Sequence, residues 1–166
     1  GVLRGSDPAR ADQHIIYTAH YDHLGSGDPD AEGDTIYNGA RDNASGVGMA
    51  LAIGRAFAAL PERPRRSIML ALVAAEEQGL IGSEYYAQYP TVPAGLIAAN
   101  INYDSGNIWG ETRDITYIGL GKSTLDAVAG EVAAYQQRVV KGDQFPDRGM
   151  YYRSDQFNFA KIGVPA

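Results

Sequence analysis

Acidic and imidazole side chains recur in this sequence where apolar stretches end. They follow His14–Ala19, Ile68–Ala75 and Leu96–Tyr103, and one more precedes a long apolar helical pattern. The residues concerned are His20, Asp22, His23, Asp42, Glu76, Glu77 and Asp104. Several carboxylates gathered without lysines need a cation, because like charges in a partly dry site repel strongly. One imidazole with several carboxylates suits zinc or manganese better than copper.

The two residues His20 and Asp22 are best interpreted as a pair. In an extended segment residues i and i+2 point the same way. The carboxylate of Asp22 can therefore hold the second ring nitrogen of His20, as groups behind a metal ligand commonly do. His14 and His23 have no comparable partner in the sequence, and we interpret them as structural.

The other acidic residues differ in how strongly they indicate a metal site. Asp42 is explained equally well as a cap or dipole partner at a helix N-terminus. Glu76 and Glu77 directly follow a buried-strand pattern, IMLALVAA, where a solvated face is not expected. Because adjacent side chains point apart, one can bind a metal while the other faces the reacting water. Asp104 repeats this placement after IAANINY.

Alternating strand and helix patterns predict the elements that position these side chains. The expected strands are 14–19, 66–75, 96–103 and 115–119, with 163–166 strand-like, and the expected helices are 45–60, 83–89, 123–137 and 154–161. This alternation predicts an α/β fold, a three-layer α/β/α sandwich with a mainly parallel central sheet. Ligands of such folds bind outside the carboxyl ends of the strands, where the acidic residues are expected to meet.

Composition narrows the function classes. The chain has 166 residues, enough for one domain with a real core. With no cysteine, it has no disulfide, thiolate zinc site, iron–sulfur cluster or cysteine nucleophile. A net charge of −6 without an extended basic cluster argues against nucleic-acid binding. The longest strongly apolar run is too short to span a membrane, and the N-terminal residues lack the pattern of a secretory signal.

Five motifs together resemble the M28 family of zinc peptidases, the co-catalytic aminopeptidase type. In chain order they are AHYDHLG (19–25), NGARDNASGV (38–47), AAEEQGLIGS (74–83), NYD (102–104) and RSDQFNFAKIGVPA (153–166). The likeness is strongest to bacterial members with an inserted protease-associated domain. It implies a zinc-exopeptidase-like fold and a single, partial catalytic domain over residues 1–166.

The resemblance also implies a role for each site residue. His20 and Asp104 would bind one zinc ion, Asp42 would bridge two ions, and Glu77 would bind the second. Glu76 would be the general base and Asp22 would orient His20. Asp155, in the RSDQ segment, would support the site from behind.

One departure from the family pattern concerns the second zinc ion. The family takes a further histidine ligand from a segment downstream of the GVPA-like strand, and this chain ends before it. Neither His14 nor His23 stands in a matching motif. We therefore expect a C-terminally truncated chain, with a second site that has only Asp42 and Glu77 as protein ligands and a fragment that is inactive by itself.

The implied reaction is hydrolysis of a peptide bond, releasing N-terminal residues from a peptide substrate. Two metal ions would lower the pKa of a shared water, and Glu76 would take its proton and pass it to the departing amine. Aminopeptidase and carboxypeptidase action, the preferred side chain and the oligomeric state stay open. Relatives of this type are usually periplasmic or secreted, which is the expected location.

Three alternatives remain open. Glutaminyl cyclases resemble this family in fold and ligands but use a single zinc ion to close an N-terminal glutamine into a ring. A non-catalytic binding domain is the second, although the base and each ligand position within the chain are filled. Calcium binding by the acidic loop 26–34 is the third. This loop lacks the spacing of an EF-hand, and we interpret it as a solvent-exposed loop.

Overall fold

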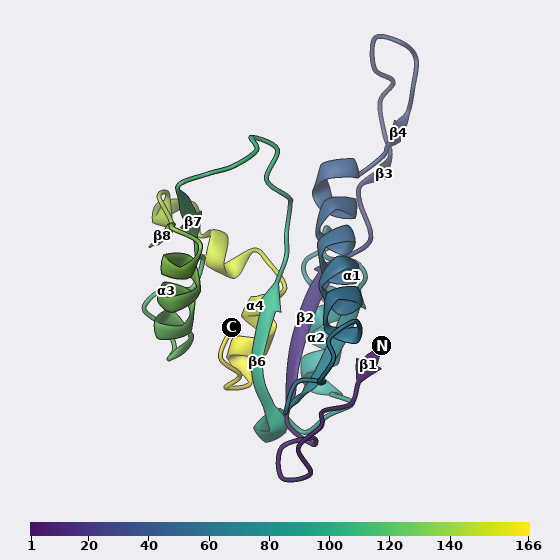
Figure 1. The fold of residues 1–166 in the computed structure, drawn as a ribbon. Coiled ribbons are helices and arrows are strands. Elements are labelled where there is room, and N and C mark those ends of the chain that lie inside the picture. Colours follow the sequence, from purple (N-terminus) through teal and green to yellow (C-terminus); the bar gives the residue numbers. More distant parts are fainter.

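A four-stranded sheet forms the centre of the computed structural model, which describes residues 1–166 (Figure 1). Its strand order is β1-β5-β2-β6. The three longer strands, β2 (His14–His20), β5 (Ser67–Val73) and β6 (Ile97–Asn102), run parallel. The short β1 (Val2–Leu3) pairs antiparallel with β5 at one edge. The expectation of a mainly parallel central sheet is confirmed.

Helices cover both faces of this sheet. Neighbouring residues of a strand point to opposite faces, and in β2 both faces carry side chains that pack against helices. Tyr17 of β2 faces α1 (Ser45–Ala58), where its ring centroid lies 6.0 Å from that of Phe57. Ile16, one residue earlier, is fully buried on the other face with Phe159 of α4 (Gln156–Lys161). The sheet is therefore the middle layer of an α/β/α arrangement.

Helix α1 lies close against β5 and begins beside the site. A Cβ at Gly54 would lie 2.5 Å from Cδ1 of Leu70, so the glycine lets the helix approach β5 without moving this leucine side chain. The side-chain oxygen of Asn43 accepts the backbone N–H of Gly46 at 3.0 Å, which satisfies one free donor of the first turn. Pro61 follows the end of the helix. The expected helix at 45–60 is thus found at nearly the same bounds.

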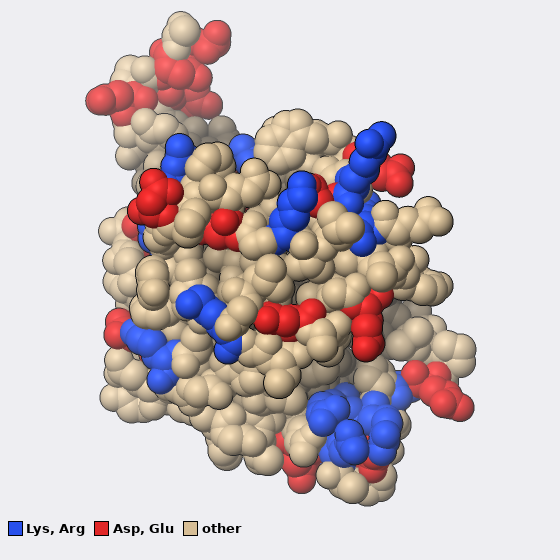
Figure 2. Space-filling model, turned by 90° about the vertical axis from the view of Figure 1, so that its left-hand side faces the viewer, with Lys and Arg blue, Asp and Glu red and all other residues tan.

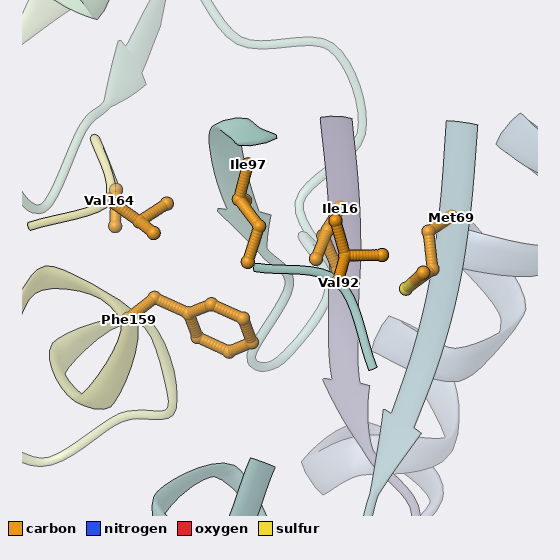
Figure 3. Close-up of a cluster of buried hydrophobic side chains, with 7 residues drawn as sticks. Ile16, Met69, Val92, Ile97, Phe159 and Val164 are labelled. Atoms are coloured by element: carbon orange, nitrogen blue, oxygen red, sulfur yellow. The ribbon is translucent and has the colours of Figure 1, made fainter. Parts of the chain in front are cut away.

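The opposite face carries α2 (Ile81–Gln88) and α4, which pack side by side. The Tyr86 and Phe159 ring centroids, one from each helix, are 5.5 Å apart. The buried cluster beneath them consists of Ile16, Met69, Val92, Ile97, Phe159, Val164 and Ala166 (Figure 3). Through this core α4, late in the chain, packs against the strands that precede the acidic residues.

Two small sheets lie outside the central one. β7 (Asp114–Thr116) pairs parallel with β8 (Val139–Lys141), and together with α3 (Leu125–Tyr135) they lie beyond the β6 edge (Figure 1). β3 (Gly25–Ser26) and β4 (Ile36–Tyr37) form a projecting hairpin whose tip carries acidic side chains (Figure 2). The expected strand at 115–119 thus pairs outside the central sheet.

Short helical turns complete the chain: η1 (Ala40–Ala44), η2 (Ala94–Leu96), η3 (Pro146–Arg148) and η4 (Met150–Tyr152). The strand-like residues 163–166 form no strand, but the Asn100 N–H donates to the carbonyl oxygen of Pro165 at 2.8 Å, so this segment lies beside β6. No helix combines the length and the apolarity needed to cross a bilayer.

Candidate metal centre

The carboxyl ends of β2, β5 and β6 bring the expected site residues together. His20 is the last residue of β2 and is buried. Its Nε2 lies 3.4 Å from Oδ1 of Asp104, which follows β6, and 4.0 Å from Oε2 of Glu76, which follows β5. Because the three strands are parallel neighbours, their ends meet at one edge of the sheet.

Two groups of ligand-type atoms share Asp42. In the first group, one atom each of His20, Asp42 and Asp104 lie within 4.8 Å of one another. In the second, His23, Asp42 and Glu77 do the same. Asp42 is placed between them by η1, the turn that leads into α1. The structure therefore brings all four expected metal ligands, His20, Asp42, Glu77 and Asp104, to one place.

His23 lies in this site, in contrast to its interpretation as a structural residue. Its Nδ1 is 2.7 Å from Oε1 of Glu77. The two residues are 54 positions apart, so no local pattern links them. The one available sequence signal was the position of His23 in the same strand-end loop as His20 and Asp22.

Asp22 makes different contacts from those expected. Its carboxylate Oδ1 is 3.7 Å from Nδ1 of His20, beyond hydrogen-bond distance, and the backbone oxygen of Asp22 lies closer, at 3.2 Å. The carboxylate instead accepts the backbone N–H groups of Glu76 and Glu77, at 3.2 and 3.3 Å. Asp22 therefore holds His20 through its main chain and the Glu76–Glu77 turn through its side chain.

Burial and crowding shift the pKa values at the centre. Burial, together with the nearby carboxylate of Asp104, raises the pKa of Glu76 to about 7. Burial lowers the pKa of His20, but the carboxylates of Asp104 and Glu76 outweigh it and raise this pKa to about 9. Burial also raises the pKa of Asp104, but hydrogen bonds from His20 and Ser154 outweigh it and leave this pKa below its usual value.

Ser154 supports Asp104 from behind, a role that the sequence analysis missed. Its hydroxyl donates to Oδ2 of Asp104 and accepts a hydrogen bond from Nδ2 of Asn102 at 2.8 Å. Oδ1 of Asn102 in turn accepts the hydroxyl hydrogen of Thr18 at 2.7 Å. This chain of hydrogen bonds fixes the orientation of the Asp104 carboxylate relative to β2.

Asp155 lies beside this network at the start of α4. It is fully buried, and neither carboxylate oxygen has a hydrogen-bond partner. Burial raises its pKa to about 6, with a further contribution from the carboxylates of Asp104 and Asp22. A buried carboxylate without a partner behind an acidic cluster is costly unless positive charge is near.

The donor set fits a divalent metal ion. Oδ1 of Asp42 is buried and accepts no hydrogen bond, although Nε2 of His20 lies 3.1 Å away. No lysine or arginine pairs with the carboxylates of this centre, whose ion-pair contacts are to histidine alone. Imidazole nitrogens and carboxylate oxygens are ligands that zinc takes in proteins. The centre thus has ligands and negative charge but no side chain that neutralises it permanently.

Other candidate residues lie elsewhere. His14 begins β2, at the far end of the strand, and its Nδ1 contacts the Asp12 carbonyl oxygen at 3.0 Å. In the acidic loop, Oδ1 of Asp30 accepts the backbone N–H groups of Glu32 and Asp34, both at 2.9 Å. These contacts shape the hairpin tip, and none of its residues belongs to a metal-type cluster.

The protein has an α/β/α fold, with imidazole and carboxylate side chains gathered at the carboxyl ends of its parallel strands. This combination is typical of α/β proteins that bind a metal ion at this edge of the sheet. The chain belongs to Peptidase family M28, whose family model matches residues 1–166. A probable zinc metalloprotease of Pyrenophora tritici-repentis is 37% identical over 103 residues, which cover 62% of this chain and 22% of that protein.

Solved structures show the same fold. A zinc aminopeptidase from Bacillus subtilis matches with a TM-score of 0.70 and 22% identity, over 99% of this chain and 37% of that one. The glutaminyl cyclase of Porphyromonas gingivalis matches with a TM-score of 0.68 and 21% identity, over 95% of this chain and 58% of that one. The chain thus corresponds to a part of each of these longer proteins.

Proposed function

We propose that the protein is a zinc-dependent exopeptidase that releases N-terminal residues from peptides. Membership of Peptidase family M28 and the fold shared with a zinc aminopeptidase support this proposal. The observation that carries it is the position of Asp42, whose carboxylate belongs to two ligand groups at once. An aspartate shared in this way suits a pair of ions a few ångströms apart.

In this proposal His20 and Asp104 would hold one zinc ion, Glu77 would hold the other, and Asp42, which belongs to both ligand groups, would serve both. Bound zinc supplies positive charge that lowers the pKa of a water molecule and polarises the scissile carbonyl group. The hydrogen bonds from Ser154 to Asp104 and from the Glu77 backbone to Asp22 keep these side chains oriented before metal or substrate arrives.

Glu76 acts as the general base. Its Oε2 takes a proton from the attacking water as the new carbon–oxygen bond forms. The same oxygen then donates this proton to the departing amine nitrogen as the peptide bond breaks, so Glu76 ends the cycle unprotonated. The backbone hydrogen bond to Asp22 fixes the start of the Glu76 side chain, which is 11% exposed and faces His20.

Cyclisation of N-terminal glutamine is the second candidate, because a glutaminyl cyclase shares this fold. A single metal ion is enough for that reaction, and the first ligand group alone would hold it. The second group, with His23 and Glu77, favours the peptidase. A non-catalytic binding role is disfavoured because Glu76 lies beside His20, and the four expected ligand residues within this chain, His20, Asp42, Glu77 and Asp104, lie together.

The test is an assay of the complete protein, loaded with zinc, on amino-acid anilides and on glutaminyl peptides, combined with elemental analysis of bound zinc. Release of the anilide leaving group with two ions per chain is the expected result. Ring closure of glutaminyl peptides with one ion per chain would establish the cyclase instead. Absence of both reactions in the zinc-loaded protein would leave only a binding role.

A further inference from the structure

We propose that Arg41, held against the ring of Trp109 beside the metal centre, binds a carboxylate group of the peptide substrate. This inference rests on the proposed peptidase function and adds a preference for substrates with a negative charge near the bond that is cleaved. The carboxylate belongs either to an acidic side chain of the N-terminal residue or to the free C-terminus of a dipeptide. Both sources present the same chemical group to a guanidinium.

The two side chains come from segments that carry proposed metal ligands. Arg41 directly precedes Asp42, and Trp109 lies in the loop that follows Asp104. This loop and the first turn of α1 lie at the same edge of the sheet (Figure 1). Cζ of Arg41 is 5.6 Å from the centroid of the Trp109 ring, a distance at which an indole face attracts a guanidinium. The pair therefore joins the two segments at the rim of the centre.

Hydrogen bonds beneath the pair fix these segments to each other. Oδ1 of Asn43, a buried residue, accepts the backbone N–H of Ser105 at 3.0 Å. The hydroxyl of Ser45 accepts the N–H of Gly106 at 2.6 Å and donates to the carbonyl oxygen of Arg41. The turn before α1 and the loop after β6 thus form one connected unit. The position of the guanidinium is set by this unit as well as by the contact with the ring.

Arg41 has no partner of its own in the protein for its charge. Its side chain is exposed, and the ion pairs of the other arginines and of the lysines leave it without a carboxylate. Trp109 is 74% exposed, so the ring is open to a substrate as well. A guanidinium that lies over a ring keeps the N–H groups at its edge free. Two of these N–H groups match the two oxygens of a carboxylate.

The charge of the centre gives this arginine a specific effect. The carboxylates of Asp42, Glu77 and Asp104 lie together, and each one that a metal ion does not neutralise repels an acidic substrate. A positive charge beside them offsets this repulsion. A neutral substrate gains nothing from the guanidinium, whereas a carboxylate forms a charge-assisted pair with it. Arg41 therefore discriminates between substrates that differ by one charge.

The experiment measures kcat and KM of the complete, zinc-loaded protein on two matched pairs of substrates. The first pair is glutamyl anilide and its γ-methyl ester, which differ in side-chain charge. The second is alanyl-glycine and alanyl-glycine amide, which differ in the charge of the C-terminus. The variants are Arg41→Gln, Arg41→Lys and Trp109→Ala. Arg55→Ala is the control, because it removes an exposed arginine from the last turn of α1. Circular dichroism confirms that each variant is folded.

The quantity compared is the ratio of kcat/KM for the charged substrate to that for its neutral partner. In Arg41→Gln this ratio should fall about 10-fold in at least one pair, mainly through KM, and the pair that responds identifies the source of the carboxylate. Arg41→Lys should keep part of the ratio, because lysine keeps the charge but not the planar fork. Trp109→Ala should lower it, and Arg55→Ala should not change it. Added salt should lower the ratio of the original protein through screening.

Two results would overturn the inference in different ways. Ratios that are the same in Arg41→Gln and in the original protein for both pairs, with the neutral substrates still cleaved, would exclude carboxylate binding by Arg41 and leave the peptidase proposal intact. Absence of turnover of all four substrates by the original zinc-loaded protein would overturn both proposals.

Discussion

The carboxylate of Asp22 lies against the backbone of Glu76, with Oδ1 accepting the Glu76 N–H at 3.2 Å. Its other oxygen accepts the N–H of Glu77 at 3.3 Å, and the main-chain oxygen of Asp22 lies 3.2 Å from Nδ1 of His20. One residue thus connects the end of β2 to the turn after β5. This turn presents both the proposed base and a proposed metal ligand.

Replacement of Asp22 should therefore affect the whole centre. In Asp22→Ala the Glu76–Glu77 turn and the His20 imidazole lose a shared support, and zinc affinity should fall about 10- to 100-fold. Asp22→Asn keeps one acceptor oxygen and should lose less. Competition with a chromophoric chelator measures the affinities, and unchanged affinity in Asp22→Ala would contradict the support role.

Glu76→Gln separates proton transfer from metal binding. Glutamine has nearly the same shape but cannot accept a proton, so turnover by the complete protein should fall by about 10²–10⁴-fold or more. Bound zinc, measured by elemental analysis, should stay near the original level because Glu76 is not among the proposed ligands. Near-normal turnover would remove Glu76 from the role of base.

Asp42→Ala should lose both ions together, because Asp42 belongs to both ligand groups. The control is Asp34→Ala, which removes a carboxylate from the exposed hairpin and should leave metal content unchanged. Equilibrium dialysis against Zn²⁺ gives the number of ions bound by each variant. A fully loaded Asp42→Ala protein would show that the two groups do not share a ligand.

Asp155 should make the metal-free protein less stable as pH rises. Its pKa is raised by burial to about 6 from an ordinary 3.8, so the folded state favours the protonated form. Its contribution is complete below about pH 4 and is lost as pH rises through 6, with a total of about 3 kcal/mol. The original protein and the Asp155→Asn variant are compared by urea unfolding between pH 4.5 and 7.5, with a chelator present to remove metal ions.

The free energy of unfolding of the original protein, relative to that of Asp155→Asn, should fall across this pH range. The difference isolates position 155, because all other titrating groups are common to both proteins. Addition of zinc should reduce the fall, since positive charge near Asp104 favours an ionised Asp155. A difference that does not change with pH would mean that Asp155 is solvated or paired.

Local patterns were enough to predict the strand that ends at His20 and the strands that precede Glu76, Glu77 and Asp104. The β-branched and apolar runs before these residues specify buried strands, and parallel strands bring their carboxyl ends to one edge. The helix after Asp42 was likewise evident from its apolar face and the prolines that follow it.

The partners of side chains on loops were decided only by the tertiary structure. The carboxylate of Asp22 contacts the Glu76–Glu77 backbone, and His23 contacts Glu77, because the loops after β2 and β5 meet in space. Similarly, the sequence predicted a strand at 115–119 but not its partner, which is β8 outside the central sheet. Period and composition specify which face of an element is buried, but the relative placement of distant segments depends on packing of the complete core.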